Sequence, residues 1–163
     1  MAILNIVKEG DPILRKKCRP VTEITPRIRQ LIEDMADTLD DANGAGLAAP
    51  QVGIMRRIVL VVVDDEIVPM INPEIIAAEG EQEEMEGCLS VPDVWGVTHR
   101  PAKVTVRATN MDGEEFTITG EGLTARAFCH ELDHLEGVLF IDNAVHIYTP
   151  EEVEEMFGKD DEE

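Results

Sequence analysis

The stretch Cys129–Gly137, CHELDHLEG, contains two of the four histidines in the chain, four residues apart, with a glutamate directly after the first. On a helix, residues four apart lie one turn above the other, so His130 and His134 can direct ring nitrogens at one metal ion. Glu131 projects to the side, where it can reach a water on that ion. The spacing is the H-E-x-x-H pattern of metallohydrolase helices, although two surface histidines beside an ordinary glutamate would give the same letters.

A catalytic metal site of this kind needs three protein ligands and one open position, and the motif supplies two. In the metalloprotease pattern H-E-x-x-H-x-x-G-x-x-H, the third ligand is a histidine downstream. Gly137 fits that pattern, but the last position is Phe140, which binds no metal. The protease interpretation therefore fails at its third ligand, and Glu136, Asp142 and His146 remain as downstream candidates.

Cys88 is an upstream candidate, in the stretch EGCLS (Glu86–Ser90). A thiolate is a strong ligand for zinc or ferrous iron, whereas an intracellular cysteine is most often a buried structural residue. From the residues alone the two interpretations of Cys88 are equally good. We expect Cys18 and Cys129 to be structural, and Cys129 to point away from the metal-binding face of its helix.

Composition and charge restrict the class of protein. The chain has 163 residues, of which 44% are hydrophobic, and this suits one globular domain with a core built mainly of aliphatic side chains. Three cysteines without a signal peptide indicate a reduced, cytoplasmic protein. The net charge of −20 argues against binding to nucleic acids or anionic membranes. No apolar run is long enough to cross a membrane.

Secondary-structure signals alternate between helix and strand. Thr25–Gly44 predicts a helix that Thr25 caps, with one apolar stripe formed by Ile28, Leu31, Ile32, Met35 and Leu39. A second helix is expected from about Leu123 to Glu136, with Gly137 as its stop. Predicted strands are Ile58–Val63, Val68–Ile71, a stretch around Cys88–Val91, and Lys103–Thr109, the last forming a hairpin through the turn Asn110–Gly113.

These elements predict an α+β fold in which antiparallel strands pack around a central helix that carries the H-E-x-x-H motif. We expect a single catalytic domain over residues 1–163. From about residue 150 it should end in a short acidic helix, which Thr149, Pro150 and Glu152 begin as a capping box, followed by a solvated tail.

Three stretches in order, GAGLAAPQ (Gly44–Gln51), EGCLS and HELDH, strongly resemble the motifs of the peptide deformylase family. Alone, the first stretch would be only a helix stop leading into a loop. DPILR (Asp11–Arg15) and Arg100–Pro101 are also similar to family features. The resemblance extends from Ile3 to about Ile141, and three ordered motifs are far more specific than one.

The resemblance implies that Cys88, His130 and His134 bind one divalent metal ion, and that Glu131 is the general base and acid. It therefore favours Cys88 as the third ligand. Ferrous iron is the ion expected in the cell, although zinc, nickel or cobalt would suit the same ligands. The implied reaction removes the formyl group from N-formylmethionine at the start of new bacterial or organellar chains and releases formate.

The resemblance also implies roles around the metal. The Gln51 side-chain amide and the Leu89 backbone N–H would stabilise the oxyanion, and Gly46 would lie beside the substrate. Position along the chain suggests further residues for the methionine pocket, although each is also plausible as core: Ala45, Leu123, Ala127 and Phe128.

Two charged residues, Asp133 and Arg100, could support the metal ligands from behind. Asp133 is either an orienting residue behind the ligands or a solvent-facing helix acid, and Arg100 is expected to hold the Glu86 carboxylate behind Cys88. The expected partners are N-formylmethionyl peptides. Docking to the ribosome is not inferred, because the acidic C-terminal end would repel ribosomal RNA.

Two other classes of protein would use the same helix. A metalloprotease would cleave internal bonds of unformylated peptides. A zinc-stabilised binding module would close its site with a fourth protein ligand, which would have to be Cys129 or His146.

Overall fold

Helix α1 (Pro26–Ala42) forms as predicted in the computed structural model, which describes residues 2–152 and 154–155. The Thr25 hydroxyl accepts a hydrogen bond from the Ile28 N–H at 3.2 Å and so satisfies a first-turn donor. Asn43 ends the helix with a φ of 54°, in the left-handed region. The apolar stripe faces the core as expected, with these side chains buried: Ile32, Met35 and Leu39.

A five-stranded antiparallel sheet has the strand order β1-β2-β3-β6-β7. The predicted strand Ile58–Val63 is β2, and the predicted hairpin joins β6 to β7. Along β6, Val104, Val106 and Ala108 are buried and alternate with more exposed neighbours, which is the pattern of a sheet with one face on the core. The remaining bounds are β1 (Gly46–Ala48), β3 (Glu66–Glu79), β6 (Lys103–Thr109) and β7 (Glu115–Glu121).

The predicted strand Val68–Ile71 is too short, because β3 continues to Glu79. Asn72 has a φ of 51° and Pro73 has no N–H, so the alternating pattern breaks there. The strand nevertheless goes on by changing partners. It pairs with β2 as far as Ile71 and with β6 from Ile71 onward, with register shifts between Ile71 and Glu74 and between Ile75 and Ala77.

The predicted strand around Cys88–Val91 is wrong in its centre. Leu89 and Ser90 form the turn of a hairpin between β4 (Gln82–Cys88) and β5 (Val91–Arg100). A third strand that the sequence analysis did not predict, β8 (Ala144–Tyr148), pairs with β5 to complete a separate sheet of order β4-β5-β8.

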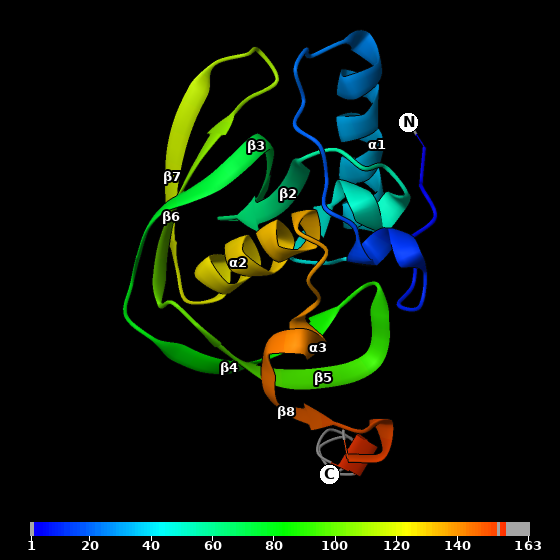
Figure 1. Ribbon diagram of the computed structural model, residues 1–163, viewed down its shortest axis with the longest axis vertical. Helices are drawn as coiled ribbons and strands as arrows, with labels where there is room; N and C mark the ends of the chain where they lie inside the picture. Colours follow the sequence, from blue (N-terminus) through cyan, green and yellow to red (C-terminus); the bar gives the residue numbers. More distant parts are fainter. Residues whose placement is uncertain (1, 153, 156–163) are drawn as a thin grey trace.

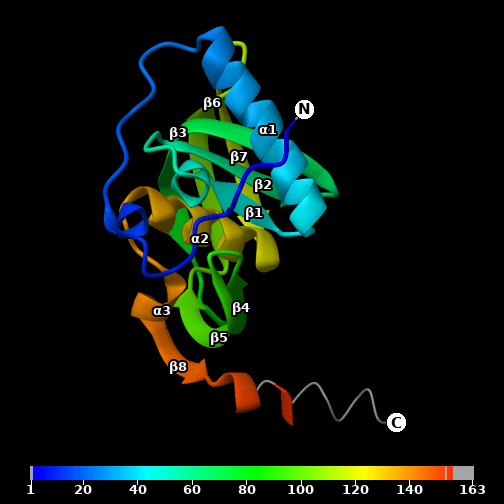
Figure 2. The same cartoon turned by 90° about the vertical axis from the view of Figure 1, so that its right-hand side faces the viewer.

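Helix α2 (Leu123–Leu135) carries the H-E-x-x-H motif and lies between the two sheets (Figures 1 and 2). It contacts β1, β2, β6 and β7 of the larger sheet and β5 of the smaller one. Gly137 follows the helix with a φ of 76°, and a Cβ there would lie 2.5 Å from the Arg15 carbonyl oxygen, so glycine is required as the predicted stop. The fold is α+β, with antiparallel sheets packed around the motif helix as expected.

Beyond α2, the chain forms α3 (Phe140–Asn143) and then β8. The predicted capping box is present, since the Glu152 N–H donates to the Thr149 hydroxyl and the Thr149 N–H donates to the Glu152 carboxylate. The expected tail, residues 156–163, lies outside the described residues. A single domain over residues 1–163 stays a prediction. Among the described helices, none has the length and apolar character to span a bilayer.

Candidate active site

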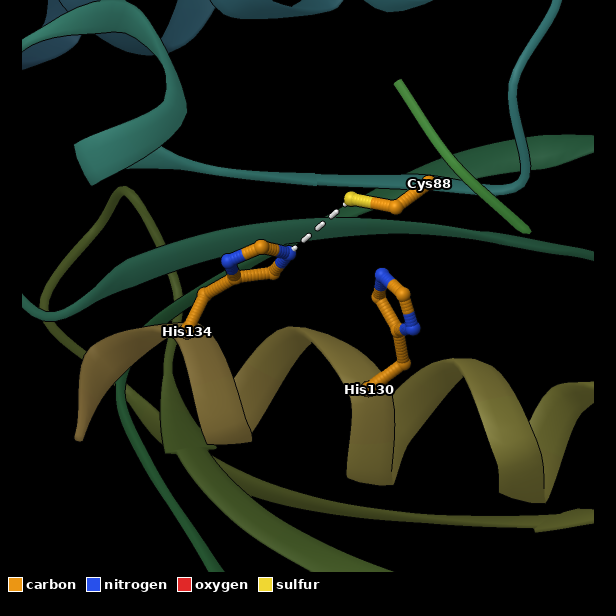
Figure 3. A group of neighbouring side chains, drawn as sticks. All are labelled: Cys88, His130 and His134. Atoms are coloured by element: carbon orange, nitrogen blue, oxygen red, sulfur yellow. Dashed lines mark hydrogen bonds between the residues drawn. The ribbon is translucent and has the colours of Figure 1, made fainter. Parts of the chain in front are cut away.

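Three side chains from two separate parts of the chain converge beside α2. The ligand atoms of Cys88, His130 and His134 all lie within 4.8 Å of one another. Figure 3 shows both imidazoles rising from α2 while the Cys88 sulfur approaches from the opposite side. The sulfur lies 3.4 Å from Nε2 of His134. Two ligands on one tetrahedral zinc-type ion would be about 3.6 Å apart, so the residues fit a bound metal ion.

Topology explains how Cys88 reaches the histidines. Cys88 is the last residue of β4, directly before the hairpin turn, and this end of the strand lies beside the buried face of α2 that carries His130 and His134. The Cys/His/His set is therefore a metal-binding triad consistent with a single divalent ion.

The downstream ligand candidates are occupied elsewhere. Glu136 pairs with Arg57, and Asp142 pairs with Arg15. His146 is on β8 with its ring against Tyr148, and its side chain is 55% exposed. In the described part of the chain, none of these three residues belongs to the group around His130 and His134.

The other two cysteines are structural, as expected. Cys18 and Cys129 are 4% and 6% exposed and belong to the same hydrophobic cluster. Cys129 is absent from the metal-binding group, so its position on the helix turns it towards the core. The closed zinc site of a binding module, which needed Cys129 or His146, does not form among the described residues.

His130 is oriented by a buried carboxylate. Its Nδ1 lies 2.9 Å from Oε1 of Glu86, so a proton on Nδ1 is shared with the carboxylate and Nε2 is left free for a metal ion. Arg100 donates to both oxygens of Glu86, at 3.0 and 3.1 Å, and to Asp133 at 2.7 Å. Thr98 donates to Glu86 as well. Arg100 thus holds Glu86 as predicted, and Asp133 is joined to this network through its contact with Arg100.

The network fixes the charge state of Glu86. Burial by itself would raise the pKa of Glu86, but hydrogen bonds from His130, Arg100 and Thr98, together with the charge of Arg100, lower it to about 2. The pKa of Arg100 is raised, because the attraction of Glu86 and Asp133 outweighs its burial. The carboxylate behind His130 is therefore ionised at any pH where the protein would work.

Glu131 lies in contact with the backbone of β1. A Cβ on Gly46 would lie 2.6 Å from Oε2 of Glu131, so only glycine leaves room for the carboxyl group. Burial raises the pKa of Glu131 to about 7, although the charge of His130 acts in the opposite direction. Its Oε1 is buried and has no hydrogen-bond partner among the described residues. A buried carboxyl group with free lone pairs and a pKa near neutrality can both take and return a proton.

The Gln51 side chain is held in one orientation. Its Oε1 accepts a hydrogen bond from the Ala48 N–H at 2.9 Å, which identifies the other amide atom as the donor. Nε2 donates to the Ser90 hydroxyl at 3.1 Å and lies 3.6 Å from the Cys88 sulfur. Gln51 is 1% exposed, so this amide points at the metal-binding group from a fixed position. This contact of Ser90 is not predicted from the sequence, because Ser90 and Gln51 are distant along the chain.

A cavity of about 480 Å³ opens beside the metal-binding group. Its lining includes Cys88, His130 and Glu131 at the inner end, and Leu123, which is 61% exposed, at the rim. Phe128 does not line it, because this ring is fully buried in the core. The predicted residues that do line the cavity are Ala45, Gly46, Gln51, Leu89, Leu123 and Ala127.

Comparison with known proteins agrees with this geometry. The family model described as polypeptide deformylase matches residues 3–149. Peptide deformylase 2 of Clostridium acetobutylicum is 52% identical over 143 residues, covering 87% of this chain and 95% of that protein. The peptide deformylase of Caldanaerobacter subterraneus is 53% identical over 154 residues, covering 94% of this chain and 97% of that protein.

Solved structures give the same result for the fold. The crystal structure of peptide deformylase from Thermotoga maritima superposes with a TM-score of 0.85 at 40% identity, covering 88% of this chain and 99% of that one. A peptide deformylase from Legionella pneumophila gives a TM-score of 0.84 at 44% identity, covering 87% and 86%. The chain belongs to the peptide deformylase family.

Proposed function

We propose that this metallohydrolase removes the N-terminal formyl group from N-formylmethionine of nascent polypeptides and releases formate. Membership of the peptide deformylase family supports the activity. The observation that carries the proposal is the convergence of the Cys88, His130 and His134 donor atoms at a cavity that Glu131 also lines.

Cys88, His130 and His134 would hold one divalent metal ion. Two imidazoles and a thiolate suit iron, zinc, cobalt and nickel alike, and we propose ferrous iron as the ion in the cell. When bound, such an ion lowers the pKa of water towards neutrality and polarises a carbonyl oxygen. Glu86 supports the site by keeping Nε2 of His130 available, since it occupies Nδ1 of the same ring.

Glu131 would move the proton. As water attacks the formyl carbon, the Glu131 carboxylate takes its proton, and it then delivers that proton to the leaving amine. The buried position and the pKa of about 7 support both roles, because such a group changes protonation state easily near neutral pH.

Gln51 and Leu89 would stabilise the negative charge that develops on the formyl oxygen. The Gln51 Nε2 donor is already aimed by Ala48 and Ser90, so little reorganisation is needed when the charge appears. The Leu89 N–H belongs to the hairpin turn directly after Cys88. A single donor of this kind is commonly worth roughly 3–4 kcal/mol of the barrier.

The methionine side chain would lie in the cavity against small and aliphatic residues. Gly46 and Ala45 leave space on one wall, and Ala127 and Leu123 supply apolar surface on α2. The substrates of this family are formylated peptides, and a cytoplasmic location beside the translation machinery follows as part of the proposal. We do not extend it to ribosome docking, because the acidic C-terminal end would be repelled by RNA.

The test is formate release from formyl-Met-Ala by anaerobically prepared protein, with metal content measured on the same sample. Glu131→Gln should lose most turnover and keep its metal, because the change removes the base and leaves the three ligands in place. Glu121→Gln, on exposed β7, is the matched control and should behave as the unaltered protein. Cleavage of internal bonds in an unformylated peptide without formate release would favour the metalloprotease instead. Full activity of Glu131→Gln would show that Glu131 does not carry the proton.

A further inference from the structure

Arg126 is a cation in the wall of the substrate cavity that the family resemblance did not point to. It is half-buried on α2, four residues before His130, and therefore on the same helix face as that metal ligand. Leu123 and Ala127 line the cavity from this face as well. The cavity thus runs along α2 from His130 back to the exposed Leu123, and Arg126 lies between its inner end and its rim.

The guanidinium of Arg126 is only partly used by the protein. Its Nη1 donates to the Met85 carbonyl oxygen at 2.8 Å. Its Nε is buried without a hydrogen-bond partner, and within the described residues no carboxylate forms an ion pair with it. Arg100, which is also close to the site, is by contrast paired with both Glu86 and Asp133. A guanidinium that is tethered by a neutral carbonyl keeps its full charge and several donors for a ligand.

The negative charge around the cavity sets Arg126 apart as a partner for acidic peptides. Among the lining side chains that the structure describes, the acidic ones are Glu86, which Arg100 neutralises, and Glu131. The chain as a whole carries −20, so an acidic peptide is repelled by most of the surface. Arg126 offers such a peptide a favourable partner in the cavity wall, because a guanidinium forms charge-assisted hydrogen bonds with a carboxylate.

We propose that Arg126 binds a carboxylate of the formylated peptide, so that the enzyme favours substrates with an acidic group shortly after the formylmethionine. The inference rests on the proposed function. Four helical residues place the Cα of Arg126 about 6 Å along α2 from that of His130. An extended peptide that follows the cavity along α2 advances about 3.4 Å per residue, so in that direction its second and third residues come level with Arg126. The carboxylate is an acidic side chain at these positions or the chain terminus of a short peptide.

A positioning role for Arg126 makes a different prediction. Its bond to the Met85 carbonyl ties α2 to β4, the strand that ends at Cys88. If that tether were its whole purpose, removing it would lower activity on acidic and neutral peptides by the same factor. The ratio of kcat/KM values for matched peptides therefore separates the two roles.

The experiment measures kcat/KM for amidated formyl-Met-Asp-Ala and formyl-Met-Ala-Asp against the same peptides with Asn in place of Asp. We expect the unaltered enzyme to favour Asp about fivefold at low salt, since a partly buried ion pair is worth about 1 kcal/mol. The preference should fall at high salt. Formyl-Met-Ala as free acid and as amide shows whether a chain terminus serves equally well.

Three variants complete the test. Arg126→Gln should bring the Asp-to-Asn ratio to about one, and Arg126→Lys should keep part of the preference because it keeps the charge. Arg29→Gln removes a charge of the same sign from an exposed position on α1. It should leave the Asp-to-Asn ratio unchanged. No preference of the unaltered enzyme for any carboxylate, or a ratio that survives in Arg126→Gln, would overturn the proposal. Failure to deformylate even the neutral peptides would instead count against the proposed function.

Discussion

The carboxylate of Glu86, near the end of β4, lies 2.9 Å from Nδ1 of His130 on α2. Arg100, the last residue of β5, binds the same carboxylate and reaches on to Asp133 on α2. One ionic network therefore joins two strands to the motif helix, directly behind the metal ligands. The position of Cys88 relative to the histidines depends on this network, because Cys88 follows Glu86 by two residues on the same strand.

Replacing Glu86 by Gln should weaken metal binding. The amide keeps the shape of the side chain but loses the charge that holds the Nδ1 proton of His130, so Nε2 becomes a poorer and less oriented ligand. We expect the metal affinity to fall about 10- to 100-fold. Competition with a chromophoric chelator of known affinity measures it.

Glu84→Gln is the matched control, since Glu84 is exposed on the same strand. It should leave the metal affinity unchanged. An affinity in Glu86→Gln equal to that of the control would mean that His130 is oriented without its carboxylate. The measurement uses zinc, which does not oxidise during the titration.

The local parts of the site could be predicted from sequence because they depend on short-range geometry. Helical periodicity alone places His130 and His134 on one face, and a Thr25 cap and a Gly137 stop bound the two main helices. The alternation of Val104 and Val106 likewise identifies a strand with one buried face. Each of these signals lies within a few residues of the feature that it predicts.

The third ligand could not be found in this way. Cys88 and His130 are 42 residues apart, and only the pairing of β4 with β5 and the packing of α2 bring them together. From the residues alone, Cys88 is equally plausible as a metal ligand and as a structural cysteine, and only the family resemblance favours the ligand. The supporting contacts of Ser90 and Arg126 were missed for the same reason, because each joins elements that are distant in sequence. The prediction of a strand around Cys88–Val91 is wrong because Leu89 and Ser90 form a two-residue turn, and the apolar and small residues there give no local turn signal.

Gly46→Ala should disable catalysis while leaving the metal in place. The added Cβ would lie 2.6 Å from Oε2 and 2.8 Å from Cγ of Glu131, so the carboxyl group has to move away from β1. A displacement of about 1 Å in a catalytic group can cost roughly 100-fold in rate, and we expect a loss of that order in kcat. Formate release and metal content are measured together.

Gly44→Ala serves as the comparison for this change. Its Cβ would meet only the ends of the Leu39 and Leu89 side chains, at 3.1 Å, and these can shift by a few tenths of an ångström. Its activity should therefore fall much less. Equal losses in the two variants would show that any bulk near this loop is harmful, and would remove the specific contact with Glu131 as the cause.

Asp142 should stabilise the protein in a pH-dependent way. Its small burial acts in the opposite direction, but hydrogen bonds from the Leu139 N–H and from Arg15 lower the pKa of Asp142. A carboxyl group with a lowered folded-state pKa contributes stability above its ordinary pKa, about 3.9, and loses it as the pH falls further. Asp142→Asn should therefore reduce the free energy of unfolding at pH 7, and the difference should shrink below about pH 4.

Denaturant unfolding at several pH values checks the effect of Asp142. Asp112→Asn, at the exposed tip of the β6–β7 hairpin, provides the control and should show no pH-dependent difference. If the deficit of Asp142→Asn were the same at pH 3 as at pH 7, the ion pair with Arg15 would not be its source.

Thiol chemistry should distinguish Cys88 from the other two cysteines. Burial raises the pKa of Cys18 and raises that of Cys129 to about 11, so at pH 8 neither is an appreciable thiolate, and both are nearly inaccessible. Cys88 lines the cavity and becomes available when a chelator removes the metal. Iodoacetamide should then add one group per folded chain, at Cys88, and three groups in urea.

Adding zinc back before the reagent should protect Cys88, because a coordinated sulfur is no longer a free nucleophile. Peptide mapping by mass spectrometry locates each modification, and Cys88→Ala, which should stay unmodified while folded, shows whether the assay reads this residue alone. Rapid labelling of Cys129 in the folded chain would contradict its packing in the core. Labelling of Cys88 at the same rate with and without zinc would mean that its sulfur is not a ligand, and the proposed hydrolytic site would lose its third donor.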